Sequence, residues 1–243
     1  MMKLIIWALA LCGIAVFSPA NAANSTLMVS GKITSISALQ NGSSVGVPTG
    51  TVQIGDNYTL TASFDLTNAK LTALFDADPR INIYYLPKTD VTLHIGSYST
   101  HFIPIFDFNS SIQLWNNYEV VGPVDSQSFS FFEYNASSSS IPFDLGAGLL
   151  SQSINFNAFD FSALARQDDL LSSLKPFSLF GVHAFSVGLL NFDTNLFVHL
   201  NGDVSSAQLE VAAIPEPSVW IMMIFGFAMV GVGLRTARPA AVQ

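Results

Sequence analysis

The chain has 243 residues, half of them hydrophobic and only 11% charged, with a formal net charge of −8. This composition, which includes 20 phenylalanines, excludes a disordered chain because it supplies enough apolar surface for a packed core. Residues 23–214 hold 16 acidic and 6 basic side chains. Such an acidic balance argues against nucleic acid and anionic membrane surfaces as partners.

The first 22 residues have the composition of a secretory signal peptide. Lys3 gives the positive start, and residues 4–17 form an apolar stretch that is short for a permanent membrane span. Ala20 and Ala22 then provide the small–x–small pattern of a signal peptidase site. We therefore predict a signal peptide over residues 1–22, cleaved after Ala22.

Cys12 is the only cysteine of the chain, and it lies inside this apolar stretch. A lipoprotein signal at Cys12 is the alternative, but Leu11 stands where such a signal needs a small residue. After cleavage the protein has no cysteine. Disulfides, a thiol nucleophile and thiolate metal sites are then excluded.

Residues 23–213 predict a β-rich body, because short alternating runs are separated by Gly, Asn, Asp, Ser and Pro. The expected strands are 26–37, 52–66, 81–86, a hairpin over 90–106, 111–115, 128–134, 151–159, 177–190, 196–200 and 205–212, with a turn at Gly202 and Asp203. Residues 162–175 have helix-like leucine spacing and leave one short helix open. We predict an all-β fold, an antiparallel two-sheet sandwich of jelly-roll type with at most one short helix.

The cleanest alternation in the body lies in residues 52–66. One expected face consists of Tyr58, Leu60, Ala62 and Phe64, and the other of Thr59, Thr61, Ser63 and Asp65. A period of two predicts that the first face is buried and the second is wet.

The common catalytic motifs are missing from the body. It has no G-x-S-x-G, no H-E-x-x-H, no P-loop, and no G-x-G-x-x-G after a strand. We therefore expect a protein that is not an enzyme, although a secreted hydrolase with scattered carboxylates stays as the least favoured alternative.

A two-residue turn at Gly96 and Ser97 would place Asp90, His94 and His101 on one face of a hairpin. Two imidazoles and a carboxylate are ligands that transition metals accept. The opposite face of the hairpin makes a good core, so a solvated face without metal is the favoured interpretation.

Two further kinds of binding site stay open. Alternating oxygen ligands at Asn191, Asp193 and Asn195, and at Asp76 and Asp78, allow calcium, although the glycine and distal glutamate of an EF-hand are missing. No cofactor is otherwise expected.

Exposed aromatic rings could stack on sugars. Trp115, at the end of an expected strand, is the favoured platform, with Tyr84, Tyr85 and Tyr118 as further candidates. The larger share of the aromatic residues stands at alternating positions typical of a core.

The C-terminal segment, residues 214–243, begins with Pro215, Glu216 and Pro217. An apolar stretch follows over residues 218–234, with a basic tail over 235–243. The triplet, the following Trp, the Met pair, Gly-Phe and the closing Arg together resemble the PEP-CTERM sorting signal of Gram-negative bacteria.

Each part of this segment has a physical role in such a signal. Trp220 can lie at the membrane interface, and Gly226 belongs to a side of small residues open to another helix. Arg235 and Arg238 favour a cytoplasmic C-terminus. Residues 218–234 are therefore expected to form a transmembrane helix.

The resemblance implies export, transient anchoring in the inner membrane, and processing near the triplet by an exosortase-type membrane protease. Pro215, Glu216 and Pro217 would be recognised by that enzyme and would not be catalytic. The destination would be the cell surface or the exopolysaccharide matrix of a biofilm. A permanent single-span anchor is the alternative.

These observations favour an exported surface or matrix protein that is structural or adhesive. A carbohydrate-binding sandwich that holds exopolysaccharide is the alternative function, and a hydrolase is the third. Nucleic acid is not expected as a partner.

Overall fold

The computed structural model describes residues 24–66, 68–71, 81–104, 109–115, 125–160, 174, 176–211 and 227. Contacts divide the chain into two units, Met1–Val211 and Ala212–Gln243. Every described residue except Phe227 belongs to the first unit, so the fold described is that of the first unit.

Antiparallel strands account for most of these residues. They are β1 Asn24–Gln40, β2 Ser43–Val45, β3 Asn57–Asp65, β4 Lys70–Leu71, β5 Ile81–Tyr85, β6 Asp90–Ile95, β7 Tyr98–Phe102, β8 Ser110–Trp115, β9 Asp125–Tyr134, β10 Leu150–Asp160, β11 Val182–Asn191 and β12 Leu196–Glu210. Short 3₁₀ helices span Ser138–Ser140 and Phe177–Leu179.

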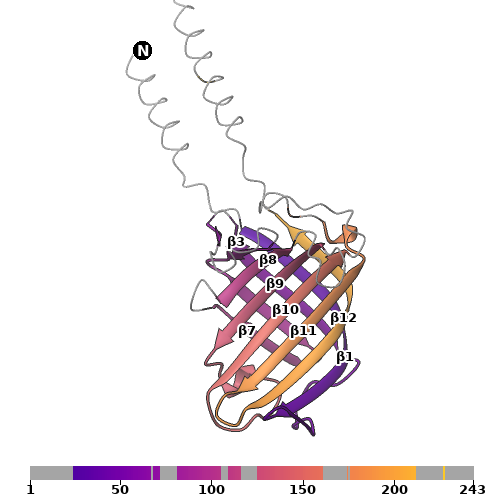
Figure 1. Ribbon diagram of the computed structural model, residues 1–243, viewed down its shortest axis with the longest axis vertical. Coiled ribbons are helices and arrows are strands. Elements are labelled where there is room, and N and C mark those ends of the chain that lie inside the picture. The colour runs from indigo at the N-terminus through magenta and orange to yellow at the C-terminus, as the bar shows by residue number, and fades with distance from the viewer. Residues whose placement is uncertain are drawn as a thin grey trace, which may run out of the picture. The chain divides into compact units, whose positions relative to one another are not determined.

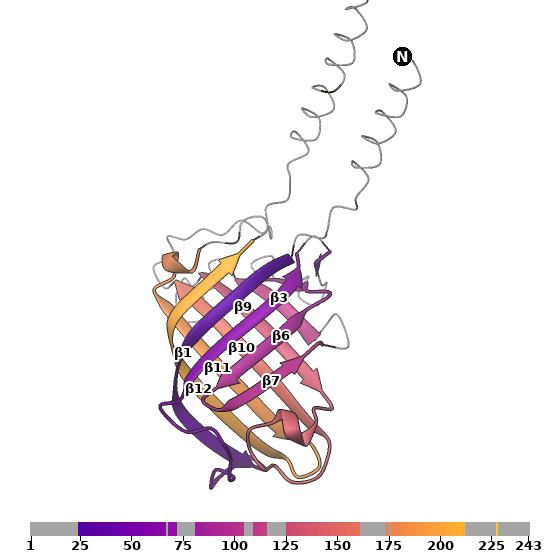
Figure 2. The same cartoon turned by 180° about the vertical axis from the view of Figure 1, so that it is seen from behind.

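All of these strands belong to one sheet, in the order β4-β5-β8-β9-β10-β11-β12-β1-β3-β6-β7, with β2 paired to β1. The sheet curls over on itself, so that β8–β12 form one half (Figure 1) and β1, β3, β6 and β7 form the other (Figure 2). The all-β antiparallel prediction is confirmed. The expected two sheets differ from the structure, because the β1–β12 ladder joins both halves into a single sheet.

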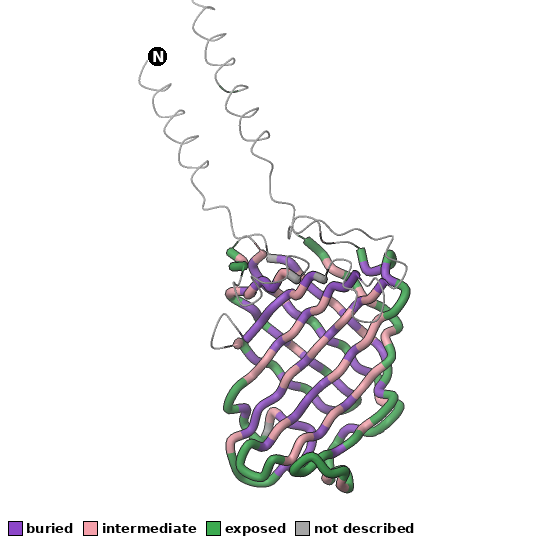
Figure 3. Tube along the Cα trace, in the orientation of Figure 1, coloured by how far each residue is buried: buried purple, intermediate pink, exposed green. Residues whose placement is uncertain are grey.

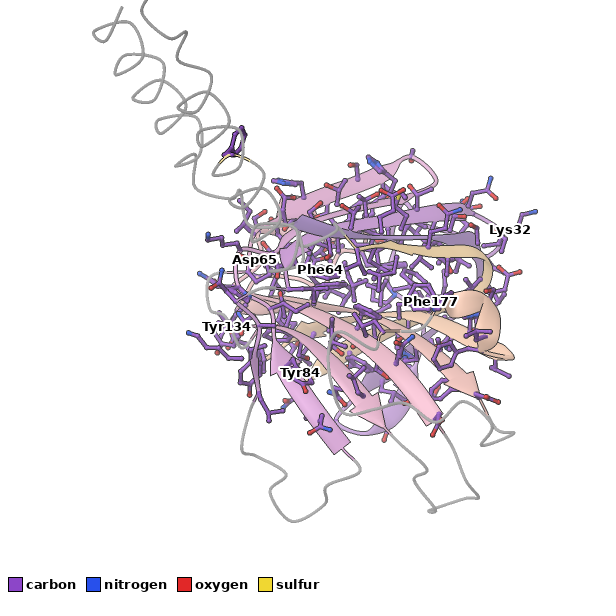
Figure 4. All side chains as sticks on the ribbon, turned by 90° about the horizontal axis from the view of Figure 1, so that it is seen from above. Lys32, Phe64, Asp65, Tyr84, Tyr134 and Phe177 are labelled. Atoms are coloured by element: carbon purple, nitrogen blue, oxygen red, sulfur yellow. The ribbon has the colours of Figure 1, made fainter. Side chains whose placement is uncertain are left out.

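Apolar side chains from both halves fill the space between them, and burial alternates along the strands (Figure 3). Tyr58, Leu60, Ala62 and Phe64 are buried, which confirms the predicted inward face of β3. Phe64 points into the core between the two halves of the sheet (Figure 4). The centroid of its ring lies 6.0 Å from that of Phe129, so this contact joins β3 to β9 across the core.

Asp65 was expected on the wet face of β3, and this prediction is wrong because the residue is fully buried. Its carboxylate accepts hydrogen bonds from the backbone N and the Nδ2 of Asn68, at 3.3 and 2.7 Å. Lys88 Nζ lies 3.9 Å from Asp65 Oδ2. The carboxylate is therefore used to fix the chain where β3 ends.

Two further boundaries differ from the prediction. Gly202 and Asp203 lie inside the continuous strand β12 and form no turn. The strand expected over residues 177–190 begins only at Val182, after the 3₁₀ helix Phe177–Leu179. The expected helix over 162–175 lies outside the described residues apart from Leu174.

The hairpin of β6 and β7 confirms its predicted register. Ile95 pairs with Tyr98, His94 with Ser99, and Thr92 with His101. Gly96 has a φ of 57°, which the first central residue of a type II′ turn requires.

Tyr58 occupies the place where the two halves of the sheet meet. Its ring stacks on that of Phe185, with centroids 3.9 Å apart and an interplanar angle of 11°. Its hydroxyl donates a 2.7 Å hydrogen bond to the backbone oxygen of Asp203. Glycines allow this approach, since an added Cβ would lie 2.7 Å from Tyr58 Cε1 at Gly202 and 1.8 Å from the Asp203 oxygen at Gly31.

The signal-peptide residues Ala20 and Ala22 lie outside the described residues, as do the sorting triplet Pro215, Glu216 and Pro217, the anchor residues Trp220 and Gly226, and Arg235 and Arg238. Within the ranges that the structure describes, no helix has the length and apolar character needed to cross a membrane.

We expect Gly202→Ala to lower the free energy of unfolding by about 1–3 kcal/mol, since its methyl group would overpack the contact between Tyr58 and Phe185. Urea unfolding of the full chain measures this. Gly46→Ala is the matched control, because an added Cβ there meets nothing within 4 Å. Equal stability of the two variants would contradict the proposed packing role of Gly202.

Candidate functional site

Within the half formed by β8–β12, the outer side of strands β8–β11 is largely polar and uncharged. We call this surface the outer face. Its outward positions are Ser111, Gln113, Ser126, Ser128, Ser130, Phe132, Tyr134, Ser151, Ser153, Asn155, Asn157, Phe159, Val182, Ala184, Ser186, Gly188 and Leu190. Three of these serines, Ser111, Ser126 and Ser151, are buried. None of these described positions holds Asp, Glu, Lys, Arg or His. The solvent side of a sheet is ordinarily polar, but its usual charged residues are missing here.

A row of hydrogen-bonding side chains crosses this face from strand to strand. We call it the polar row, and the pairing register aligns its members in the order Ser111, Ser130, Asn155, Ser186, Asn201 and Ser35. With strands about 4.8 Å apart, a row across six strands follows the sheet for about 24 Å.

Direct hydrogen bonds hold two parts of the polar row. Ser130 Oγ donates to Asn155 Oδ1 at 2.8 Å, and Asn201 Nδ2 donates to Ser35 Oγ at 3.0 Å. Hydroxyls and amides can both donate and accept, so each retains capacity for a further partner. Ser111 is buried, so the accessible part of the row runs from Ser130 to Ser35. This part offers a track of neutral donors and acceptors that suits a ligand rich in hydroxyl groups.

One end of the outer face is aromatic. Tyr134 contacts Phe132 and Phe192, with ring centroids 6.2 and 5.6 Å apart. Phe197 stacks on His199 at 5.8 Å. We call these five residues the aromatic cluster. Two of its rings are well exposed to solvent, Tyr134 at 44% and Phe192 at 37%.

Gly188 lies between the two parts of this cluster and allows the Phe197 ring to lie against the sheet. A Cβ at Gly188 would lie 3.0 Å from Phe197 Cε2 and 2.7 Å from Ser153 Oγ. The glycine therefore keeps the ring close to the sheet surface. Burial also lowers the pKa of the His199 imidazole, which favours its uncharged form.

The histidines of the β6–β7 hairpin lie on its solvent side, as predicted. His101 Nε2 lies 2.9 Å from Asp90 Oδ1, with both side chains about half exposed, while His94 is exposed beside Thr59 on β3. Among the residues that the structure describes, no three His, Cys, Asp or Glu side chains are placed to hold a metal. The three residues thus form an exposed His101–Asp90 hydrogen bond and a separate imidazole.

The candidate calcium residues Asn191, Asp193 and Asn195 have a structural role in the turn between β11 and β12. Asn191 is fully buried, and its Oδ1 accepts from the backbone N of Asp193 at 2.9 Å and of Thr194 at 3.2 Å. Its Nδ2 donates to the Leu145 and Ala147 oxygens. The amide is therefore fully occupied within the protein. Asp76 and Asp78 lie outside the described residues.

The aromatic platform predicted at Trp115 is not described, since only the backbone of that residue is placed, and Tyr118 lies outside the described ranges. Tyr84 is buried, so it cannot act as a platform, and Tyr85 is half-buried. Sequence reasoning missed the aromatic cluster. The period of two in β9, read outward from the buried Phe129 and Phe131, would have identified Phe132 and Tyr134.

A second polar group lies inside the curled sheet. Gln152 is buried, and its Nε2 donates to Glu133 Oε2 and, at 3.4 Å, to Thr100 Oγ1. Burial raises the pKa of the Glu133 carboxyl, and the hydrogen bond from Gln152 opposes this rise. Burial also raises the pKa of Tyr98 to about 12.

A hollow of about 440 Å³ opens beside Tyr98, lined by Thr49, Ile141, Phe143 and Leu145 among others. Tyr98 donates from its hydroxyl to the Ser140 oxygen, which ties β7 to the loop after β9. The loop is held on its other side by hydrogen bonds from Thr51 N to the Pro142 oxygen and from Asp144 N to the Thr49 oxygen, both 2.9 Å. The walls of the hollow are thus fixed mainly by backbone contacts.

Comparison with known proteins found no match to the chain among family models, curated proteins or solved structures. The features of the chain that bear on its function are therefore the outer face and the two terminal segments of the sequence.

We expect Glu133→Gln to stabilise the protein at pH 7. Because the fold raises the pKa of Glu133, the protonated carboxyl favours the fold below about pH 4.3, and this contribution is lost as the pH rises through the raised value. The neutral amide keeps an acceptor for Gln152 without that loss. Urea unfolding between pH 4 and 7 measures the effect.

The variant should become more stable than the wild type as the pH rises. Glu210→Gln, at an exposed position near the end of β12, is the control and should run parallel to the wild type. If the free energy of unfolding of Glu133→Gln ran parallel to that of the wild type between pH 4 and 7, ionisation of Glu133 would not destabilise the fold.

Proposed function

We propose that the chain is an exported surface or matrix protein whose body adheres to exopolysaccharide through the outer face. The observation that supports adhesion is the polar row, a line of uncharged hydrogen-bonding side chains across six strands. Polysaccharides present many hydroxyl groups along an extended chain. A row of serine and asparagine side chains matches them without burying a charge.

Delivery to the surface rests on the two ends of the sequence. The signal peptide over residues 1–22 would direct export, and the segment 214–243 resembles a PEP-CTERM signal, with a transmembrane helix over 218–234. In this proposal an exosortase-type membrane protease recognises Pro215, Glu216 and Pro217 and releases the body. Anchoring in the inner membrane would then be transient.

A hydrolase is the weaker proposal, because the outer face offers hydrogen-bonding groups and rings but no carboxylate among its described outward positions. Glycoside hydrolysis needs two carboxyl groups facing one another. Binding without turnover fits the chemistry of this face better.

Adhesion through the polar row predicts that Ser130→Ala with Asn155→Ala weakens binding about tenfold. The two substitutions remove both partners of one hydrogen bond together with their capacity to bind sugar hydroxyls, and net hydrogen bonds contribute about 0.5–1.5 kcal/mol each. Binding of the purified full-length chain to exopolysaccharide from the producing cells measures this.

Thr59→Ala with Thr61→Ala is the matched control, since both threonines are exposed on β3 in the other half of the sheet. It should bind as the wild type does. A wild-type chain that does not bind exopolysaccharide would disprove the adhesive function.

Sorting predicts that the mature protein ends at or near Pro215–Pro217 when it is recovered from the cell surface or the medium. Mass spectrometry of the C-terminal peptide measures this end. A mature chain that still contains Arg235 would instead support a permanent anchor.

A further inference from the structure

We propose that the aromatic cluster is a stacking subsite for an uncharged pyranose whose ring substituents are equatorial, as in a flat β-linked glucan. This inference rests on the proposed adhesive function and names the class of sugar that the outer face would select. Such a ring presents a face of axial C–H groups, which packs against aromatic rings, and an edge of hydroxyls, which needs hydrogen-bonding neighbours.

Two rings of the cluster are placed to receive a sugar. Tyr134 ends β9 and Phe192 begins the turn after β11, and their centroids lie 5.6 Å apart with the rings inclined by 48°. Both rings are more than one third exposed, whereas the large aromatic side chains inside the sheet are fully buried. The exposed pair is therefore available to a ligand, and Phe132 packs against Tyr134 beside it.

The polar partners for the sugar edge lie next to these rings. In the register, Ser153 lies between Phe132 and Gly188 and is partly exposed, so it can reach a sugar hydroxyl. Ser151, between Tyr134 and Leu190, is buried and supports the surface from below. Asn155 of the polar row faces the same side of β10, two residues beyond Ser153. The cluster and the row thus form one continuous surface, and a bound glycan chain could contact both.

Charge on and around the cluster favours a neutral sugar. The cluster has no carboxylate or basic side chain other than His199, whose uncharged form is favoured by burial. Exposed Asp193 follows Phe192 in the turn, and the body as a whole is strongly acidic. Anionic glycans such as uronates would be repelled at this end of the face, and the described residues of the cluster hold no Lys or Arg to pair with them.

The test compares two probes on the purified full-length chain, cellohexaose as the neutral glycan and a mannuronate hexamer as the anionic one. The wild type should bind cellohexaose more tightly than the mannuronate hexamer by about tenfold or more. Tyr134→Ala should weaken cellohexaose binding about tenfold, which corresponds to about 1.4 kcal/mol. Tyr134→Phe keeps the ring and should bind within about threefold of the wild type.

Ile54→Ala is the matched control, because Ile54 is an apolar side chain with 65% exposure that lies outside the cluster. Urea unfolding of each variant confirms that binding changes do not come from lost structure. Phe192→Ala repeats the test at the second ring and should give a loss similar to that of Tyr134→Ala.

Three results would overturn the subsite. Equal binding of both hexamers would disprove the selection of neutral sugars, and unchanged cellohexaose binding by Tyr134→Ala would disprove stacking. A dimeric wild type that becomes monomeric in Tyr134→Ala, with glycan binding intact, would assign the cluster to a second copy of the chain. The adhesive function is tested separately by Ser130→Ala with Asn155→Ala. If that variant binds exopolysaccharide more weakly than the wild type, the adhesive function holds in all three cases.

Discussion

The contact between Tyr58 and Phe185 is the constraint on which the curled sheet depends. Two rings stack at 3.9 Å where strands β3 and β11 face one another, and the tyrosine hydroxyl bonds to the backbone of β12. This approach is sterically allowed only because Gly31 and Gly202 have no side chains. The ladder between β1 and β12 shifts register close to this point, between Ser30 and Gly31 and again between Ile33 and Ser35. Bulges of this kind bend and twist a sheet, so close packing and curvature occur at the same place.

The continuity of the sheet links its curvature to the polar row. Because β12 pairs with β1, the polar row continues from Asn201 to Ser35, whose side chains are joined by a hydrogen bond. A sandwich of two separate sheets would end such a row at an edge strand. The core itself is filled mainly by aromatic and aliphatic residues on the inward side of the strands.

Sequence reasoning predicted the parts of the fold that depend on local pattern. The β6–β7 hairpin and the buried face of β3 followed from a period of two and a glycine turn. Gly202 was misinterpreted because a glycine beside an aspartate indicates a turn, whereas here the glycine is needed by a ring from a strand distant in sequence. Asp65 was misplaced for a similar reason, since its partners Asn68 and Lys88 lie beyond its own strand. The polar row could not be predicted, because it exists only once six strands are aligned in register.

The pairing of β1 with β12 also determines how the body responds to a mechanical load. Thr26, near the start of β1, lies opposite Glu210, at the end of β12, so both strands reach the same end of the sheet. Tension between the C-terminal end of β12 and a ligand held on the outer face would run along the strands. Beyond Gly202 the load would shear the ladder to β1 alone, and over Leu196–Gly202 the ladders to β1 and β11 would be sheared together. A sheet joined in this way resists pulling along its strands much more than peeling at its edges.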